Sequence, residues 1–163
     1  MGSGGLVEEP DGSDEPPPPR ERAADRTRGH DYLAMAASYV AAAQCLASRA
    51  ENNSAPFHML VAHSLELSLK AILAHDGRDE EWLMMAGHDL DHCHREARLT
   101  GFSGQADLEL SDLVRTLDRP HADQRFRYPV LFGNNPRLVA SDTVQALRVH
   151  LTDVGAWLSF ARR

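Results

Sequence analysis

A narrow polar stripe runs through the most apolar helical segment of the sequence, residues 55–75. It consists of His63, Glu66 and Lys70, and Lys70 is the only lysine in the chain. At 3.6 residues per turn, these side chains project from one side of a helix, within about 60° of one another. Two interpretations are open: an exposed Glu66–Lys70 ion pair on a solvent-facing strip, or the floor of a polar site, where a buried pair needs further polar partners.

Two other parts of the chain offer such partners. His88 and Asp89 stand at the start of an expected helix and bring an imidazole and a carboxylate. Arg125, Arg127 and Tyr128 belong to a loop that holds the one concentration of basic residues in this net-acidic chain. Guanidinium groups bind phosphate or carboxylate groups with a two-pronged fork, so the loop predicts an anionic ligand. In the alternative interpretation, the arginines pair with acids of neighbouring helices.

Metal binding is the next chemistry to consider, because His88 and His92 are four residues apart. Asp91, Cys93 and His94 stand beside them. That spacing can place two imidazoles on one ion. However, the chain has no His-Glu-x-x-His and no Cys-x-x-Cys motif, and Asp and His residues at a helix start often serve only to stabilise that end. We therefore expect no metal ion and no other cofactor.

The composition narrows the class of protein. A formal net charge of −7 argues against general affinity for nucleic acid, although a local basic patch is compatible with it. There is no apolar core of a secretory signal and no run of about 18 continuous apolar residues, so we expect a cytoplasmic protein without a membrane span. Cys45 and Cys93 are then expected to be buried free thiols. The preference for Ala and Arg over Lys suggests a bacterial protein.

The chain is expected to form one domain behind a tail. Residues 1–28 are rich in Pro, Gly and charge, which is typical of a disordered tail. Residues 29–163 suffice for one compact core, and apolar residues recur there at helical spacing. We predict an all-α, up-and-down helical bundle of about five helices. Their expected bounds are residues 31–50, 55–75, 88–99 and 105–117, with a last helix from Ser141 or Asp142.

A long loop is expected between the last two helices. Pro120 should end the fourth helix, because proline lacks the backbone N–H that a helix interior needs. A connection of about twenty residues then runs from Arg119 to Ala140. Loops of this length in a compact domain are usually functional or partly disordered.

Three short motifs appear in order along this helical background: residues 63–70 (His-Ser-Leu-Glu-Leu-Ser-Leu-Lys), 87–90 (Gly-His-Asp-Leu) and 127–129 (Arg-Tyr-Pro). Together they resemble bacterial HEPN domains, over about residues 31–160. The resemblance implies an up-and-down helical bundle with a short extra helix, often a homodimer. It also implies nucleotide binding, metal-independent RNA cleavage, or partnership with a small nucleotidyltransferase-type antitoxin.

The RNase branch of that family carries an Arg, four to six further residues and then a His, and Arg115 with His121 fits this spacing. Such a pair would activate a ribose 2′-hydroxyl and stabilise the phosphorane charge. About two or three such pairs are expected by chance in this sequence, and Pro120 is expected to break the helix between the partners. If the chain is a nuclease, the resemblance implies His121 with Arg115, Arg125 or Arg127 as the catalytic set.

Three functions therefore stay open. The leading hypothesis is a binding module, in which Glu66, Lys70, His88, Arg127 and Tyr128 converge on a pocket or shared interface for a nucleotide, RNA or partner protein. The second is a metal-independent RNase toxin of a toxin–antitoxin or defence system. The third is a non-catalytic dimerisation domain, in which the same residues form a buried network that fixes helix register.

Overall fold

The computed structural model describes residues 19–48, 54–128 and 136–160, and every regular element in these ranges is an α-helix. The predicted all-α bundle is therefore confirmed. The helices are α1 (Pro19–Ala47), α2 (Ala55–His75), α3 (Glu80–Met85), α4 (Leu90–Leu99), α5 (Asp107–Ala122) and α6 (Ala140–Ser159).

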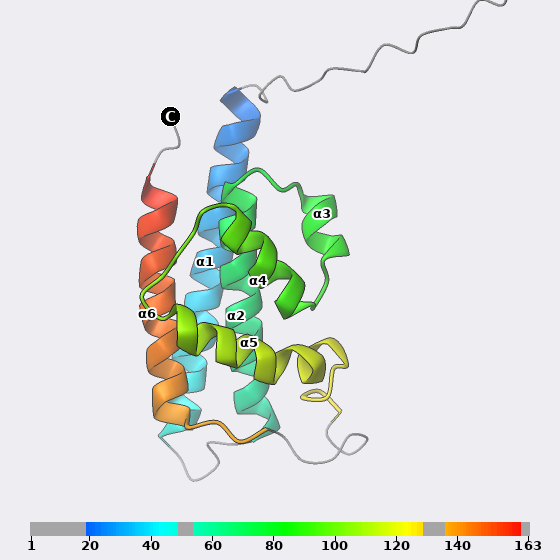
Figure 1. The fold of residues 1–163 in the computed structure, drawn as a ribbon, viewed down its shortest axis with the longest axis vertical. Coiled ribbons are helices and arrows are strands. Elements are labelled where there is room, and N and C mark those ends of the chain that lie inside the picture. Colours follow the sequence, from blue (N-terminus) through cyan, green and yellow to red (C-terminus); the bar gives the residue numbers. More distant parts are fainter. Residues whose placement is uncertain (1–18, 49–53, 129–135, 161–163) are drawn as a thin grey trace, which may run out of the picture.

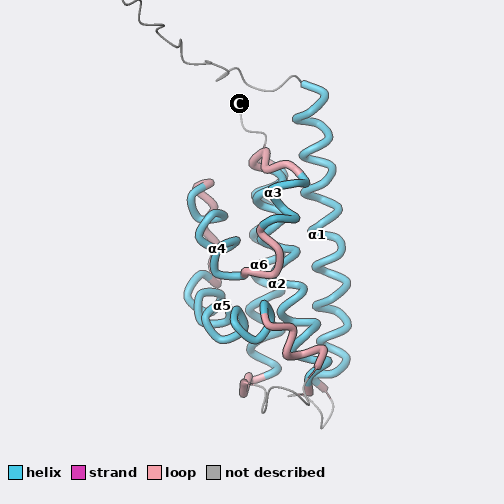
Figure 2. Tube along the Cα trace, turned by 90° about the vertical axis from the view of Figure 1, so that its right-hand side faces the viewer, coloured by secondary structure: helices cyan, strands magenta, loops and turns pink. Residues whose placement is uncertain are grey.

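Helix α2 is the centre of the bundle. It lies beside the two other long helices, α1 and α6 (Figure 1), while α4 and α5 cover the face away from α1 (Figure 2). It contacts all five other described helices. This position explains why α2 is apolar nearly all the way round: almost every side of it faces another helix, and burial of apolar surface is the main force that holds the bundle together.

The ends of α2 follow from local sequence signals. Ser54 Oγ accepts a hydrogen bond from Phe57 N at 3.4 Å, and Pro56 occupies the first turn. Gly77, just past the end, takes a left-handed conformation with φ of +101°. The expected bounds of this helix are therefore confirmed. By length and composition α2 would also suffice to cross a membrane, yet 83% of that apolar window is buried inside the fold.

The first helix begins earlier than expected, at Pro19, so residues 19–28 are helical rather than part of a tail. These residues include four Arg, two Ala and one Glu, which are strong helix formers. Gly29 does not mark the helix start; it lies where α1 approaches α2, and an added Cβ there would stand 3.0 Å from Ala71 O. The expected disordered tail before Pro19 lies outside the described residues.

Two further helical segments differ from expectation. The short helix α3 was not predicted; the Asp79 side chain caps it by accepting a hydrogen bond from Trp82 N at 2.7 Å. Helix α5 does not end at Leu117 but continues through Pro120 to Ala122. A proline so close to the end of a helix removes only one interior hydrogen bond, and the next residues still close the helix, with Asp123 N donating to Arg119 O at 3.0 Å.

The two cysteines are both free thiols, but they differ in burial. Cys93 is buried, as predicted, and burial raises its pKa to about 12. Cys45 is exposed on α1, so the expectation that it is buried was wrong.

Candidate functional site

The centre of the site is the carboxylate of Glu66, which projects from the middle of α2 and is only 3% exposed. Its Oε1 accepts a hydrogen bond from Lys70 Nζ at 2.8 Å. Its Oε2 accepts from His121 Nε2 at 2.7 Å and from His88 Nδ1 at 2.9 Å. The polar stripe is therefore the floor of a polar site and not a solvent-facing strip. We call Glu66, Lys70, His88 and His121, with His63 at the edge, the Glu66 cluster.

Three segments far apart in the sequence build this cluster. Lys70 follows Glu66 by one helical turn on α2, and His121 comes from the last turn of α5. His88 belongs to the turn between α3 and α4, where Gly87 takes a left-handed φ of +57°. Lys70 Nζ also donates to Gly87 O at 2.8 Å, which ties that turn to α2. The cluster thus holds two segments of the chain onto the central helix.

His63, whose side chain is 22% exposed, completes the cluster. Its Nδ1 lies 3.7 Å from Glu66 Oε2, so it adds a polar neighbour rather than a short hydrogen bond. Tyr39 of α1 meets the His63 ring edge to face, with the ring centroids 4.6 Å apart. All three residues of the predicted stripe therefore face the same site.

The electrostatics of the cluster favour an ionised carboxylate. Burial alone would raise the pKa of Glu66, because a charged group is costly to bury. Hydrogen bonds from His121, Lys70 and His88, together with the nearby His63 ring, outweigh that cost and hold the pKa of Glu66 well below its usual range. Glu66 thus presents a fixed negative charge to the imidazoles, which orients their ring protons toward Oε2.

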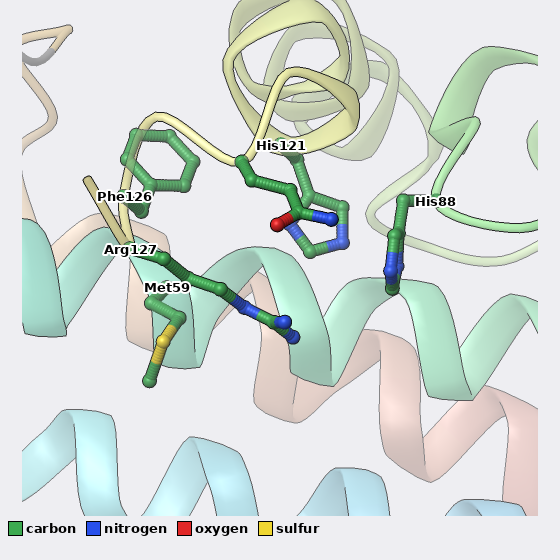
Figure 3. Close-up of a pocket in the computed structure, with 6 residues that line it drawn as sticks. Met59, His88, His121, Phe126 and Arg127 are labelled. Carbon is green, nitrogen blue, oxygen red and sulfur yellow. The ribbon is translucent and has the colours of Figure 1, made fainter. Parts of the chain in front are cut away.

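A small hollow opens beside the cluster. Arg127 lines it and, as Figure 3 shows, reaches along α2 toward His121 and His88. The ring of His88 is 35% exposed, so it borders both the buried carboxylate and the hollow. The residues that line the hollow are Met59, His88, His121, Gln124, Phe126 and Arg127.

The chain reaches this position through a tight reversal after α5. Gln124 adopts a left-handed φ of +55°, and its carbonyl oxygen accepts from Arg127 N at 3.0 Å. Phe126 is buried and stacks on the His58 ring, with centroids 5.3 Å apart. His58 is itself held between Ser54 O at 2.8 Å and Pro136 O at 2.6 Å. These contacts anchor the segment that carries Arg127.

Arg125, which was also predicted for the site, has an acidic partner near it in sequence, and so does the neighbouring Arg119. Arg125 Nη2 pairs with Asp123 Oδ2 at 3.0 Å, and Arg119 Nε lies 3.7 Å from the same oxygen. Within the part of the chain that the structure describes, Arg127 has no acidic partner. In the basic loop, Arg125 thus pairs with a nearby acid and Arg127 faces the hollow, whereas Arg137 is exposed and lines a different hollow.

Several other expectations are corrected by the structure. Asp89 is exposed and caps α4 by accepting from His92 N at 2.7 Å, so it does not join the cluster. Tyr128 is 57% exposed and does not line the hollow. Pro129 of the third motif lies outside the described residues.

The predicted pair of Arg115 and His121 does not meet. Six residues on a helix correspond to about 240°, which turns the two side chains to different sides of α5. Arg115 is exposed and pairs with Asp112 at 2.8 Å, whereas His121 is buried against Glu66. Any joint action of an arginine with His121 falls to Arg127.

The two histidines that the sequence analysis considered as a candidate metal pair, His88 and His92, do not converge either. His88 turns toward Glu66, whereas the His92 ring packs against Trp82 with centroids 5.4 Å apart. The sequence analysis also missed three lining residues, Met59, Gln124 and Phe126. Their types carry no chemical signal, and only the fold reveals them.

No protein-family model, no curated protein and no solved structure matches this chain. The resemblance to HEPN domains therefore rests on its three motifs and stays a prediction. The geometry adds one fact to it: the first two motifs are in contact at Glu66, and Arg127 of the third lines the adjoining hollow.

Proposed function

We propose that this chain binds a phosphate-bearing ligand, a nucleotide or RNA, at the surface over the small hollow between Arg127 and the Glu66 cluster. The observation that carries the proposal is the Arg127 guanidinium, which has no acidic partner among the described residues and lies beside the half-exposed His88. A guanidinium has five N–H donors in a fixed fork that matches the oxygens of a phosphate.

The buried carboxylate contributes to binding indirectly. A phosphate would be repelled by Glu66 itself, but the carboxylate is covered by Lys70 and by the imidazoles. Because His88 donates its Nδ1 proton to Glu66, its other ring nitrogen is left to accept a hydrogen bond from a ligand hydroxyl. Arg127 and His88 would thus recognise a phosphate next to a hydroxyl, a combination that ribonucleotides provide.

The HEPN resemblance supports the same class of ligand and suggests how the domain is used. We propose a bacterial HEPN-like domain that forms a homodimer and pairs with a small nucleotidyltransferase-type antitoxin. This part of the proposal rests on the three sequence motifs alone.

The binding test compares two arginines. A nucleoside triphosphate and a labelled RNA oligonucleotide are titrated, in EDTA, into the wild-type protein, Arg127→Ala and Arg137→Ala. Arg137 is the matched control, because it is exposed, has no acidic partner among the described residues, and lies outside this hollow. We expect Arg127→Ala to raise the Kd about tenfold or more, since a charge-assisted hydrogen bond contributes about 1.5–3 kcal/mol. Equal Kd values for the two variants would contradict the proposal.

A second function, metal-independent RNA cleavage, is favoured by one observation. Two imidazoles are oriented by a carboxylate beside an arginine, an arrangement in which His88 can act as general base and Arg127 can stabilise phosphorane charge. The same RNA pool, incubated in EDTA with wild type, His121→Ala and His88→Ala, tests this function. Cleavage that both variants lose would establish the nuclease, and intact RNA in all samples would leave binding as the function.

A further inference from the structure

The Glu66 cluster has a second chemical capacity that does not depend on Arg127. We propose that His63, Glu66 and His121 form a binding site for a divalent transition-metal ion such as Zn²⁺. Each of these residues offers one ligand atom, and the three atoms lie within 4.8 Å of one another. Among the described residues, this is the one group of histidine, cysteine or acidic side chains that meets this criterion.

The donor set suits such an ion. Two imidazole nitrogens and one carboxylate oxygen are a common protein ligand set for zinc, with a fourth position open for water or a ligand. Metal–ligand bonds of about 2.0–2.2 Å in a tetrahedron place neighbouring ligand atoms about 3.3–3.6 Å apart. The observed distances from Glu66 Oε2, 2.7 Å to His121 Nε2 and 3.7 Å to His63 Nδ1, lie on either side of that range. Small side-chain adjustments would therefore suffice.

The surroundings hold the ligands in place. Lys70 Nζ binds Oε1 of Glu66 and leaves Oε2 directed at the histidines. Lys70 is in turn fixed by Gly87 O, and His63 by the ring of Tyr39. Residues that orient metal ligands in this way typically affect metal affinity by 10–100-fold.

The charge balance predicts what the open position would take. Glu66 and Lys70 cancel each other, so a bound divalent ion would leave the site with a net positive charge when the imidazoles are neutral. An anionic fourth ligand, such as hydroxide or a phosphate oxygen, would therefore be favoured. His88 also lies next to the ligating carboxylate, with its Nδ1 2.9 Å from Oε2.

The test uses full-length protein that has been stripped of metal with EDTA and dialysed. Co²⁺ is titrated in, and its visible absorption bands report the coordination geometry; Zn²⁺ is then added as a competitor. We expect a single Co²⁺ ion per chain in a four- or five-coordinate site, displaced by Zn²⁺. Far-UV circular dichroism and thermal unfolding of every variant check that the fold is kept.

Three variants assign the ligands. His121→Ala removes a buried ligand, and His63→Ala removes a partly exposed one whose loss should leave the fold intact. We expect each to weaken Co²⁺ binding at least tenfold. The control is His92→Ala, since His92 belongs to the histidine group on α4 but packs against Trp82. No Co²⁺ binding by wild type, or binding lost only in His92→Ala, would overturn the proposal.

This outcome is separable from that of the proposed function. Phosphate binding is measured in EDTA and depends on Arg127, whereas Co²⁺ binding is measured without phosphate and depends on His63. Either result can therefore fail without the other.

Discussion

Two of the buried polar positions on helix α2 face different partners. Comparing them distinguishes the candidate site from the core. At the first, Glu66 meets Lys70, His88 and His121, and a hollow opens beside the imidazoles. At the second, two residues further on, Ser68 Oγ meets His150 Nε2 of α6 at 3.0 Å. His150 is 1% exposed and does not line the hollow beside the Glu66 cluster.

The buried histidines at the two positions, His121 and His150, have different surroundings. Burial lowers the pKa of His150 to about 3, so this ring is neutral and acts as a polar core residue. His121 instead lies 2.7 Å from the Glu66 carboxylate, which accepts a hydrogen bond from its ring, and a hollow adjoins it. A buried histidine therefore indicates a functional site only where a charge accompanies it and a space adjoins it.

The largest effect should come from removing the charge at the first position. Glu66→Ala leaves the buried Lys70 ammonium without its counter-ion and two imidazoles without their acceptor. We expect the free energy of unfolding to fall by about 3–5 kcal/mol, as measured by urea denaturation.

The matched control is Glu96→Ala, because Glu96 forms its ion pair with Arg78 at 3.0 Å nearer the surface. Its removal should change the free energy of unfolding by about 0–1 kcal/mol. If Glu66→Ala cost no more than Glu96→Ala, the cluster would not be a cooperative buried network.

The next largest effect is a pH dependence of the free energy of unfolding, which comes from His150 at the second position. A histidine whose pKa is lower in the folded state than in the unfolded state binds its proton preferentially when unfolded. Its stabilising contribution is therefore full above the unfolded value of 6.5 and is lost as pH falls toward about 3. Between pH 7 and pH 5, His150 should reduce the free energy of unfolding by about 2 kcal/mol.

The variant His150→Gln retains hydrogen-bonding capacity without titrating in this range, so its stability should vary much less between pH 7 and pH 5. Glu66 acts in a different window: its pKa is lowered by folding, so its contribution is lost only below the unfolded value of 4.5. An unchanged slope between pH 7 and pH 5 in His150→Gln would assign the pH dependence to other groups.

Much of this architecture could be predicted from the sequence, because it rests on local signals. Helical spacing predicts that His63, Glu66 and Lys70 share one side of the helix, and Pro56 and Gly77 mark the start and the end of α2. Whether the stripe was buried could not be predicted, since this depends on α4 and α5 covering it (Figure 2).

The burial of His121 on α5 was not predicted because of one residue, Pro120. One face of α5 carries five buried residues at helical spacing: Leu110, Leu113, Val114, Leu117 and His121. Because Pro120 was expected to end the helix, His121 was not assigned to that face. The sequence does not predict that Arg125 and Arg127 have different surroundings. Arg125 precedes the buried Phe126 and Arg127 follows it, and only the turn at Gln124 determines which of the two faces the hollow.

The smallest expected effect tests whether the two positions on α2 are independent. Ser68→Ala removes the oxygen that His150 Nε2 contacts, and should lower the free energy of unfolding by about 1–2 kcal/mol. Ser38→Ala is the control: the exposed Ser38 Oγ donates only to Ala34 O of its own helix, and its loss should cost less than about 0.5 kcal/mol. Both variants should leave the Kd for nucleotide and for Co²⁺ within about twofold of wild type, because neither serine touches the Glu66 cluster. A loss of affinity in Ser68→Ala alone would mean that the core histidine and the site are coupled through α2, and the distinction drawn between them would fail.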